Sequence, residues 1–97
     1  MSEPQVSAPV GRVYRLRPGR TAWHDVDGEA VVLDIEQSVY LGTNASGGVL
    51  WRALAEGATR SQLGDALIEN FDVDEPTAVE AVDSFVDACT QRDLLEP

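Results

Sequence analysis

The chain has 97 residues, the size of one ordinary domain. It carries 17 acidic and 7 basic residues, a formal net charge of −10, and every basic residue is an arginine. The imbalance lies in the C-terminal half, where residues 53–97 hold eleven acids and two arginines. Because affinity for nucleic acids comes largely from neutralising phosphates with Lys and Arg, this composition argues against a DNA- or RNA-binding protein.

Several other classes of protein are disfavoured by simple features of the sequence. The longest apolar run, Ala30–Leu33, is far too short to span a membrane, and residues 1–10 lack the basic start and apolar stretch of a secretory signal. The single cysteine, Cys89, cannot form an internal disulfide, which fits a reducing cytoplasm. The single histidine, His24, stands far from it in sequence, so no zinc-ligand or nucleophile spacing exists. We expect a cytoplasmic binding protein with no catalytic residue, no metal and no cofactor.

Strands are predicted in the first half of the chain. Residues 1–11 are small, polar and punctuated by proline, which predicts a flexible tail before a single domain over residues 12–97. Strand-like patterns follow at 21–26, 30–35 and 39–42. Asp27-Gly28 favours a two-residue hairpin turn between the first two, and the second is apolar enough that we expect both its faces to be covered. Together they predict an antiparallel meander of three strands.

Helices are predicted after residue 43, where the apolar spacing changes to a helical period. The predicted N-caps are Asn44, Thr59 (in a capping box with Gln62) and Asp74, and the helices end near Ala55, Phe71 and Arg92. The fold class is therefore α+β and winged-helix-like, with a three-stranded antiparallel sheet followed by three helices. Winged helices often bind DNA, but here the third helix carries four acids, Glu75, Glu80, Asp83 and Asp87.

The third helix is apolar on more of its surface than one core contact requires. We expect its core face to consist of Ala78, Ala81, Phe85 and Cys89. A second sector contains Val79, Val82, Asp83, Val86 and Thr90. This second sector either packs inside the domain or lines an outward groove for a partner. Composition alone leaves both interpretations open.

The third strand is the last of the meander, so it is an edge of the sheet unless the tail pairs with it. It carries no Lys, Pro or inward charge that would discourage pairing with another chain. An open edge beside an apolar helix can capture an extended peptide as an additional strand. The alternative is an edge that is covered by a loop or used for dimerisation.

Two short motifs have simpler explanations. Asp83-Ser84-Phe85 is similar to the tripeptide of acyl carrier proteins, but Ser84 lies in the middle of a helix, after three strands. Asp72-Val73-Asp74 is similar to the start of a calcium loop, but Thr77 stands where such a loop needs glycine. We interpret Ser84 as a solvent-facing helical residue and the acids as helix caps.

The ordered pattern of the chain resembles the PqqD-like family over about residues 20–96. The resemblance rests on Val31–Trp51, Gly57 before a capped helix, Leu63–Phe71, Asp72-Val73-Asp74 and a final helix ending in Leu94-Leu95. Thr43 departs from the usual Leu before Asn44, and Arg92-Asp93 departs from the customary Gly before the last leucines. These departures affect the end of the third strand and the exit of the last helix.

The resemblance implies a recognition element for ribosomally made, modified peptides. Such a domain binds the leader segment of a precursor peptide as a fourth strand against strand three and delivers it to a processing enzyme. The residues implied are Val39, Tyr40, Leu41 and Gly42 on the strand, and Val79, Val82, Asp83 and Val86 on the helix.

The small, free-standing chain most resembles the recognition protein of lasso-peptide pathways, whose partner is a leader peptidase. The alternatives are a chaperone for a radical enzyme, as in pyrroloquinoline quinone biosynthesis, and a dimerising winged-helix regulatory module. The acids of the helix favour a basic or neutral leader, with Asp83 as its polar contact.

Overall fold

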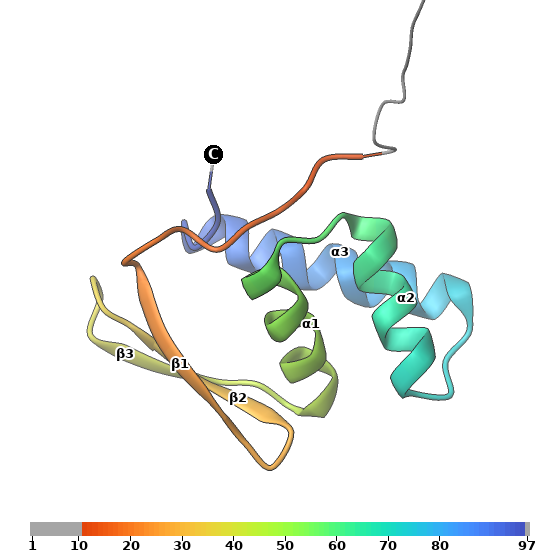
Figure 1. The fold of residues 1–97 in the computed structure, drawn as a ribbon, viewed down its shortest axis with the longest axis horizontal. Coiled ribbons are helices and arrows are strands. Elements are labelled where there is room, and N and C mark those ends of the chain that lie inside the picture. Colours follow the sequence, from red (N-terminus) through yellow and green to blue (C-terminus); the bar gives the residue numbers. More distant parts are fainter. Residues whose placement is uncertain (1–10, 97) are drawn as a thin grey trace, which may run out of the picture.

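The computed structural model describes residues 11–96 and contains three strands followed by three helices (Figure 1). The strands are β1 (Thr21–Val26), β2 (Glu29–Asp34) and β3 (Val39–Gly42), and the helices are α1 (Ala45–Glu56), α2 (Arg60–Asn70) and α3 (Glu75–Gln91). The predicted α+β fold class is confirmed. The flexible tail predicted for residues 1–11 lies, except for Gly11, outside the described residues. No helix within residues 11–96 is long and apolar enough to cross a membrane.

The sheet is an antiparallel meander in the order β1-β2-β3, as predicted. Asp27 and Gly28 both have positive φ, 54° and 84°, which is the geometry that a two-residue hairpin turn requires. On β2 every second side chain is buried, namely Ala30, Val32 and Asp34, while the intervening ones are only half-buried. The expectation that both faces of β2 are covered is therefore wrong, because all three helices lie on one side of the sheet (Figure 1).

The three predicted N-caps are confirmed, and they fix where each helix begins. The side chains of Asn44 and Asp74 accept hydrogen bonds from the backbone N–H groups of Gly47 and Thr77, at 2.8 and 3.0 Å. Thr59 forms the predicted reciprocal capping box. Each cap satisfies a backbone donor that the first helical turn leaves without a partner.

The core lies between the helices and the inner face of the sheet. Its largest fully buried side chains include Leu54, Leu63, Val32, Val82 and Val86. Trp51 of α1 meets Trp23 of β1 edge to face, with ring centroids 6.4 Å apart. The sheet is thereby anchored to α1, which sets the position of β3 relative to the helices.

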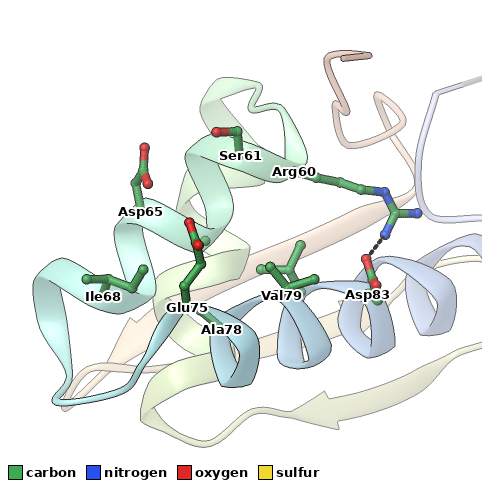
Figure 2. A pocket seen from close by; sticks show the side chains of 10 residues that line it. Arg60, Ser61, Asp65, Ile68, Glu75, Ala78, Val79 and Asp83 are labelled. Atoms are coloured by element: carbon green, nitrogen blue, oxygen red, sulfur yellow. Dashed lines mark hydrogen bonds and ion pairs between the residues drawn. The ribbon is translucent and has the colours of Figure 1, made fainter. Parts of the chain in front are cut away.

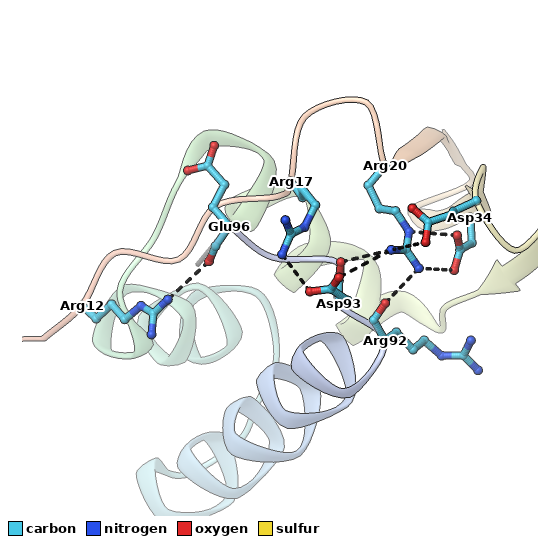
Figure 3. Close-up of polar contacts among 8 residues, drawn as sticks. Arg12, Arg17, Arg20, Asp34, Arg92, Asp93 and Glu96 are labelled. Atoms are coloured by element: carbon cyan, nitrogen blue, oxygen red, sulfur yellow. Dashed lines mark hydrogen bonds and ion pairs between the residues drawn. The ribbon is translucent and has the colours of Figure 1, made fainter.

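A buried ion pair ties the end of the sheet to the end of α3. Arg20 is 6% exposed and donates from Nε and Nη2 to the two carboxylate oxygens of Asp34, at 3.0 and 3.2 Å. The same guanidinium donates to the backbone carbonyl of Arg92 at 3.0 Å (Figure 3). Its hydrogen bonds hold the pKa of Asp34 below its usual value, so the carboxylate stays charged inside the protein. This network fixes the distance between the sheet and the C-terminal end of α3.

Gly48 allows α1 to approach the β1–β2 turn closely, and we expect Gly48→Ala to lower the free energy of unfolding by about 1–3 kcal/mol. A Cβ atom at this position would collide with the carbonyl oxygen of Gly28 and lie 3.2 Å from the Cα atom of Glu29, both backbone atoms that cannot yield easily. A chemical-denaturation curve measures the loss. The matched control is Gly64→Ala on α2, where a Cβ meets nothing within 4 Å and should stabilise the helix by about 0.5–1 kcal/mol. Equal effects at the two positions would contradict the close packing at Gly48.

Candidate functional site

The outer edge of β3 presents backbone groups that no strand within residues 11–96 uses. The N–H of Thr43 donates to the carbonyl of Ala30 on β2, at 3.1 Å. Residues of an antiparallel ladder alternate between facing their partner strand and facing away from it. Leu41 therefore also faces β2, whereas the N–H and C=O groups of Tyr40 and Gly42 point to the open edge. The predicted edge strand is confirmed within the described residues.

The side chains of β3 alternate between the two faces of the sheet. Leu41 points to the helical layer and packs against the core. Tyr40 points to the opposite face, where it is 74% exposed. An added strand would likewise direct every second side chain towards the helices and the others towards solvent.

A cavity of about 280 Å³ lies between β3 and the C-terminal half of α3. We call it the β3–α3 groove and define it by its outer residues, which are Leu41, Gly42, Phe85, Ala88 and Arg92. Its floor includes the core residues Val32, Trp51 and Cys89. An open strand edge thus runs beside a mainly apolar hollow, which is the arrangement that β-augmentation uses.

The structure contradicts the orientation predicted for α3. Val82 and Val86, predicted to be able to line an outward groove, are each 1% exposed and belong to the core together with Ala78 and Cys89. Ala81, predicted to be core, is exposed. The reason is that Val82 and Val86 bury more apolar surface than Ala81 would, so they turn towards the domain interior, while Phe85 stays half-buried against the core.

Val79 and Asp83 lie on the side of α3 that faces α2, not on the side of the β3–α3 groove. Val79 is 52% exposed and lines a cleft of about 260 Å³ between α2 and α3. Figure 2 shows this cleft, with Ile68 at one end and the ion pair between Arg60 and Asp83 at the other. The four predicted helix residues thus split between the core and this second cleft, and the structure brings none of them to the hollow beside β3. The residues that sequence reasoning missed there are Ala88 and Arg92, while Phe85 was assigned to the core.

Cys89 is buried, whereas the other two reactive side chains considered in the sequence, Ser84 and His24, lie at the surface. Burial raises the pKa of the Cys89 thiol to about 11, as expected for a small core residue rather than a nucleophile. Ser84 and His24 are both exposed. Within residues 11–96 no three His, Cys, Asp or Glu side chains gather in a way that could hold a metal ion.

Two solved structures have the same fold. "TbiB1 in Complex with the TbiA(beta) Leader Peptide" superposes with a TM-score of 0.75 and 28% identity, over 84% of this chain and 94% of that one. "Lasso peptide synthetase B1 complexed with the leader peptide" superposes with a TM-score of 0.73 and 20% identity, over 87% of this chain and 98% of that one. No curated protein matches the sequence.

The family model described as "Coenzyme PQQ synthesis protein D (PqqD)" matches residues 29–95. The matched region begins with β2, includes β3 and all three helices, and ends at the buried Leu95. It therefore contains both walls of the β3–α3 groove. Because this match covers more than half of the chain, the protein belongs to the PqqD family.

Proposed function

We propose that this protein is a non-catalytic adaptor that binds the leader segment of a ribosomally made precursor peptide as a fourth strand on β3. The observation that carries the proposal is the open edge of Tyr40 and Gly42 beside the apolar β3–α3 groove. Two similar folds, TbiB1 and lasso peptide synthetase B1, were solved as complexes with leader peptides, which supports it.

At this site, backbone groups would supply affinity for the leader and side chains would supply specificity. The N–H and C=O groups of Tyr40 and Gly42 offer up to four backbone hydrogen bonds, which any extended peptide can make. Leu41, Phe85 and Ala88 offer apolar contact to the side chains that such a strand directs towards the helices. Micromolar binding corresponds to about 8 kcal/mol, which a preformed edge and groove of this kind can supply.

The proposed binding residues therefore differ in part from those predicted from the sequence. The strand residues Val39, Tyr40, Leu41 and Gly42 remain in the proposal. On α3 and at its C-cap we now propose Phe85, Ala88 and Arg92 as leader contacts, in place of Val79, Val82, Asp83 and Val86. Asp83 is engaged by Arg60 on the far side of the helix, so it is no longer proposed as the polar contact.

The processing enzyme that receives the leader is proposed to be a lasso-pathway leader peptidase. The resemblance to TbiB1, at 28% identity over 94% of that chain, favours this partner. A radical enzyme of the pyrroloquinoline-quinone type is the second candidate, which the PqqD match favours. Co-purification of the full chain and its leader with each candidate enzyme distinguishes the two.

An amide NMR titration with the leader peptide encoded beside this gene tests the proposal. We expect the shifts to concentrate on Tyr40, Gly42, Phe85 and Ala88, since these residues line the edge and the groove. Shifts confined to Val79 and its neighbours in the α2–α3 cleft would contradict the proposed site. Sedimentation of the free protein is the companion measurement, because a tight dimer joined through β3 would leave no edge for the leader and would favour the dimerising module.

A further inference from the structure

Arg92 differs from the other six arginines of the chain. Each of the others donates a hydrogen bond to a carboxylate or a backbone carbonyl within residues 11–96: Arg12, Arg15, Arg17, Arg20, Arg52 and Arg60. The Arg92 guanidinium makes no hydrogen bond or ion pair with any residue in that range. This is unexpected in a chain with 17 acidic residues, where a cation has many potential partners.

Arg92 stands at one end of the β3–α3 groove. It lines that groove together with Leu41 and Ala88, and it also lines the adjoining hollow of about 360 Å³ that contains Val39. Its backbone is held in place, since its carbonyl accepts a hydrogen bond from buried Arg20. Figure 3 shows the Arg92 side chain extending away from the cluster formed by Arg20, Asp34 and Asp93. A fixed backbone thus presents a solvent-exposed cation to the site.

The acids nearest to this end of the groove already have partners. Asp34 is paired with Arg20, and Asp93 accepts a hydrogen bond from Arg17 at 2.7 Å. Glu36 lies 3.6 Å from the Arg20 guanidinium. The helix α3 itself carries four acids, Glu75, Glu80, Asp83 and Asp87, which disfavour an acidic peptide, so Arg92 is a local cation beside a negative helix.

We infer that Arg92 selects leader peptides with a carboxylate side chain at one position, opposite Val39–Leu41 and facing α3. This inference rests on the proposed function, because it assigns a specificity contact within the same site. Successive side chains of a strand point to opposite faces, so only one of two neighbouring positions reaches Arg92. The carboxylate replaces the internal partner that this arginine lacks. The recognised leader is therefore apolar towards Phe85 and acidic at the Arg92 end, rather than basic throughout.

A phage-displayed library of random decapeptides, selected on the full-length chain, tests this inference across a wide range of leader sequences. Synthetic copies of the selected peptides are then titrated by amide NMR and calorimetry. We expect enrichment of Asp or Glu at a single position, and moving the acid by one residue should remove its contribution. Arg92→Gln should weaken binding of the acidic peptide about three- to fivefold, which is the upper part of the range for an exposed ion pair. Arg92→Glu should weaken it about tenfold, because repulsion between two carboxylates is added to the loss of the pair. Selection on Arg92→Glu should enrich Lys or Arg at the same position.

The control is Arg12→Glu, which changes the net charge equally but replaces an arginine whose contacts are the carbonyl of Glu96 and the ring of Tyr14. It should leave the affinity of the acidic peptide unchanged, and an equal loss in both variants would reduce the effect to net charge and overturn the inference. Peptides that shift Tyr40 and Gly42 without any acidic preference would also overturn it, while leaving the proposed function intact. Peptides that bind elsewhere would overturn both.

Discussion

Replacing Ala88 by Glu is expected to abolish leader binding while the domain stays folded, whereas Val82→Glu is expected to unfold it. Ala88 is exposed on the groove side of α3, where Glu is a good helix former and stands one turn before Arg92. The free energy of unfolding of the Ala88→Glu variant should differ from that of the unmodified chain by no more than about 0.5 kcal/mol. A bound leader, however, would bury the new carboxylate under an apolar strand, at a cost of about 2–4 kcal/mol, or a 30- to 1,000-fold loss of affinity.

Val82 is 1% exposed, so a carboxylate there has neither water nor a partner. The expected cost of about 4–5 kcal/mol is comparable with the whole stability of a domain of this size. Circular dichroism melts and calorimetric titration of both variants measure the two effects separately. Val79→Glu is the third variant, and it should retain both fold and affinity because that side chain is 52% exposed on the α2 side of the helix. Full binding by Ala88→Glu would exclude the groove as the leader site, and an unchanged melt for Val82→Glu would contradict the core assignment.

The element boundaries could be predicted from the sequence because they depend on neighbouring residues. Asp27-Gly28 supplies the positive φ angles of its turn, and Asn44, Thr59 and Asp74 each cap a backbone N–H only three positions away. The residues that make such interactions lie within a few positions of one another in the sequence. The order of strands and helices, and with it the fold class, followed from them.

The orientation of α3 could not be predicted from helical periodicity, because apolar residues cover about half of its circumference and one core contact needs less. The observed core face, centred on Val82, is rotated by about 50° from the predicted one at 100° per residue. Side-chain volume was the signal in the sequence that could have identified the observed core face. Burying the two valines, Val82 and Val86, removes more apolar surface from water than burying Ala81. The final choice depends on Leu63 and Trp51, which α3 meets only in the folded chain.

The buried pair of Arg20 and Asp34 was also missed, although the strand carried a sign of it. Asp34 has the same alternation as Ala30 and Val32, so it had to face the core, where a charge requires a partner. Fourteen positions separate the two side chains, and no local rule identifies Arg20 as that partner. Arg92 is positioned by a contact of still longer range, since its carbonyl accepts a hydrogen bond from Arg20, 72 positions away. This explains why the α3 wall of the groove could not be predicted.

Gly42→Pro is expected to weaken leader binding about 10- to 100-fold without loss of stability, whereas Gly42→Ala should bind as the unmodified chain does. The Gly42 N–H points to the open edge, so proline removes a donor that the leader needs and β2 does not use. The leader carbonyl left without a partner costs about 1–3 kcal/mol. A Cβ atom at this position meets nothing within 4 Å, so alanine adds a side chain and keeps the donor.

This pair of variants separates the loss of the backbone donor from the effect of adding a Cβ atom at position 42. Thermal melts check the fold and calorimetry measures the affinity. A proline variant that unfolds would contradict the expectation that this position tolerates proline, which rests on the alternation inferred from the Thr43–Ala30 hydrogen bond. A proline variant that binds with full affinity would mean that the leader does not pair with β3 here. Loss of binding in the proline variant alone supports a strand added at this edge, because proline blocks the backbone N–H of position 42 whereas alanine keeps it.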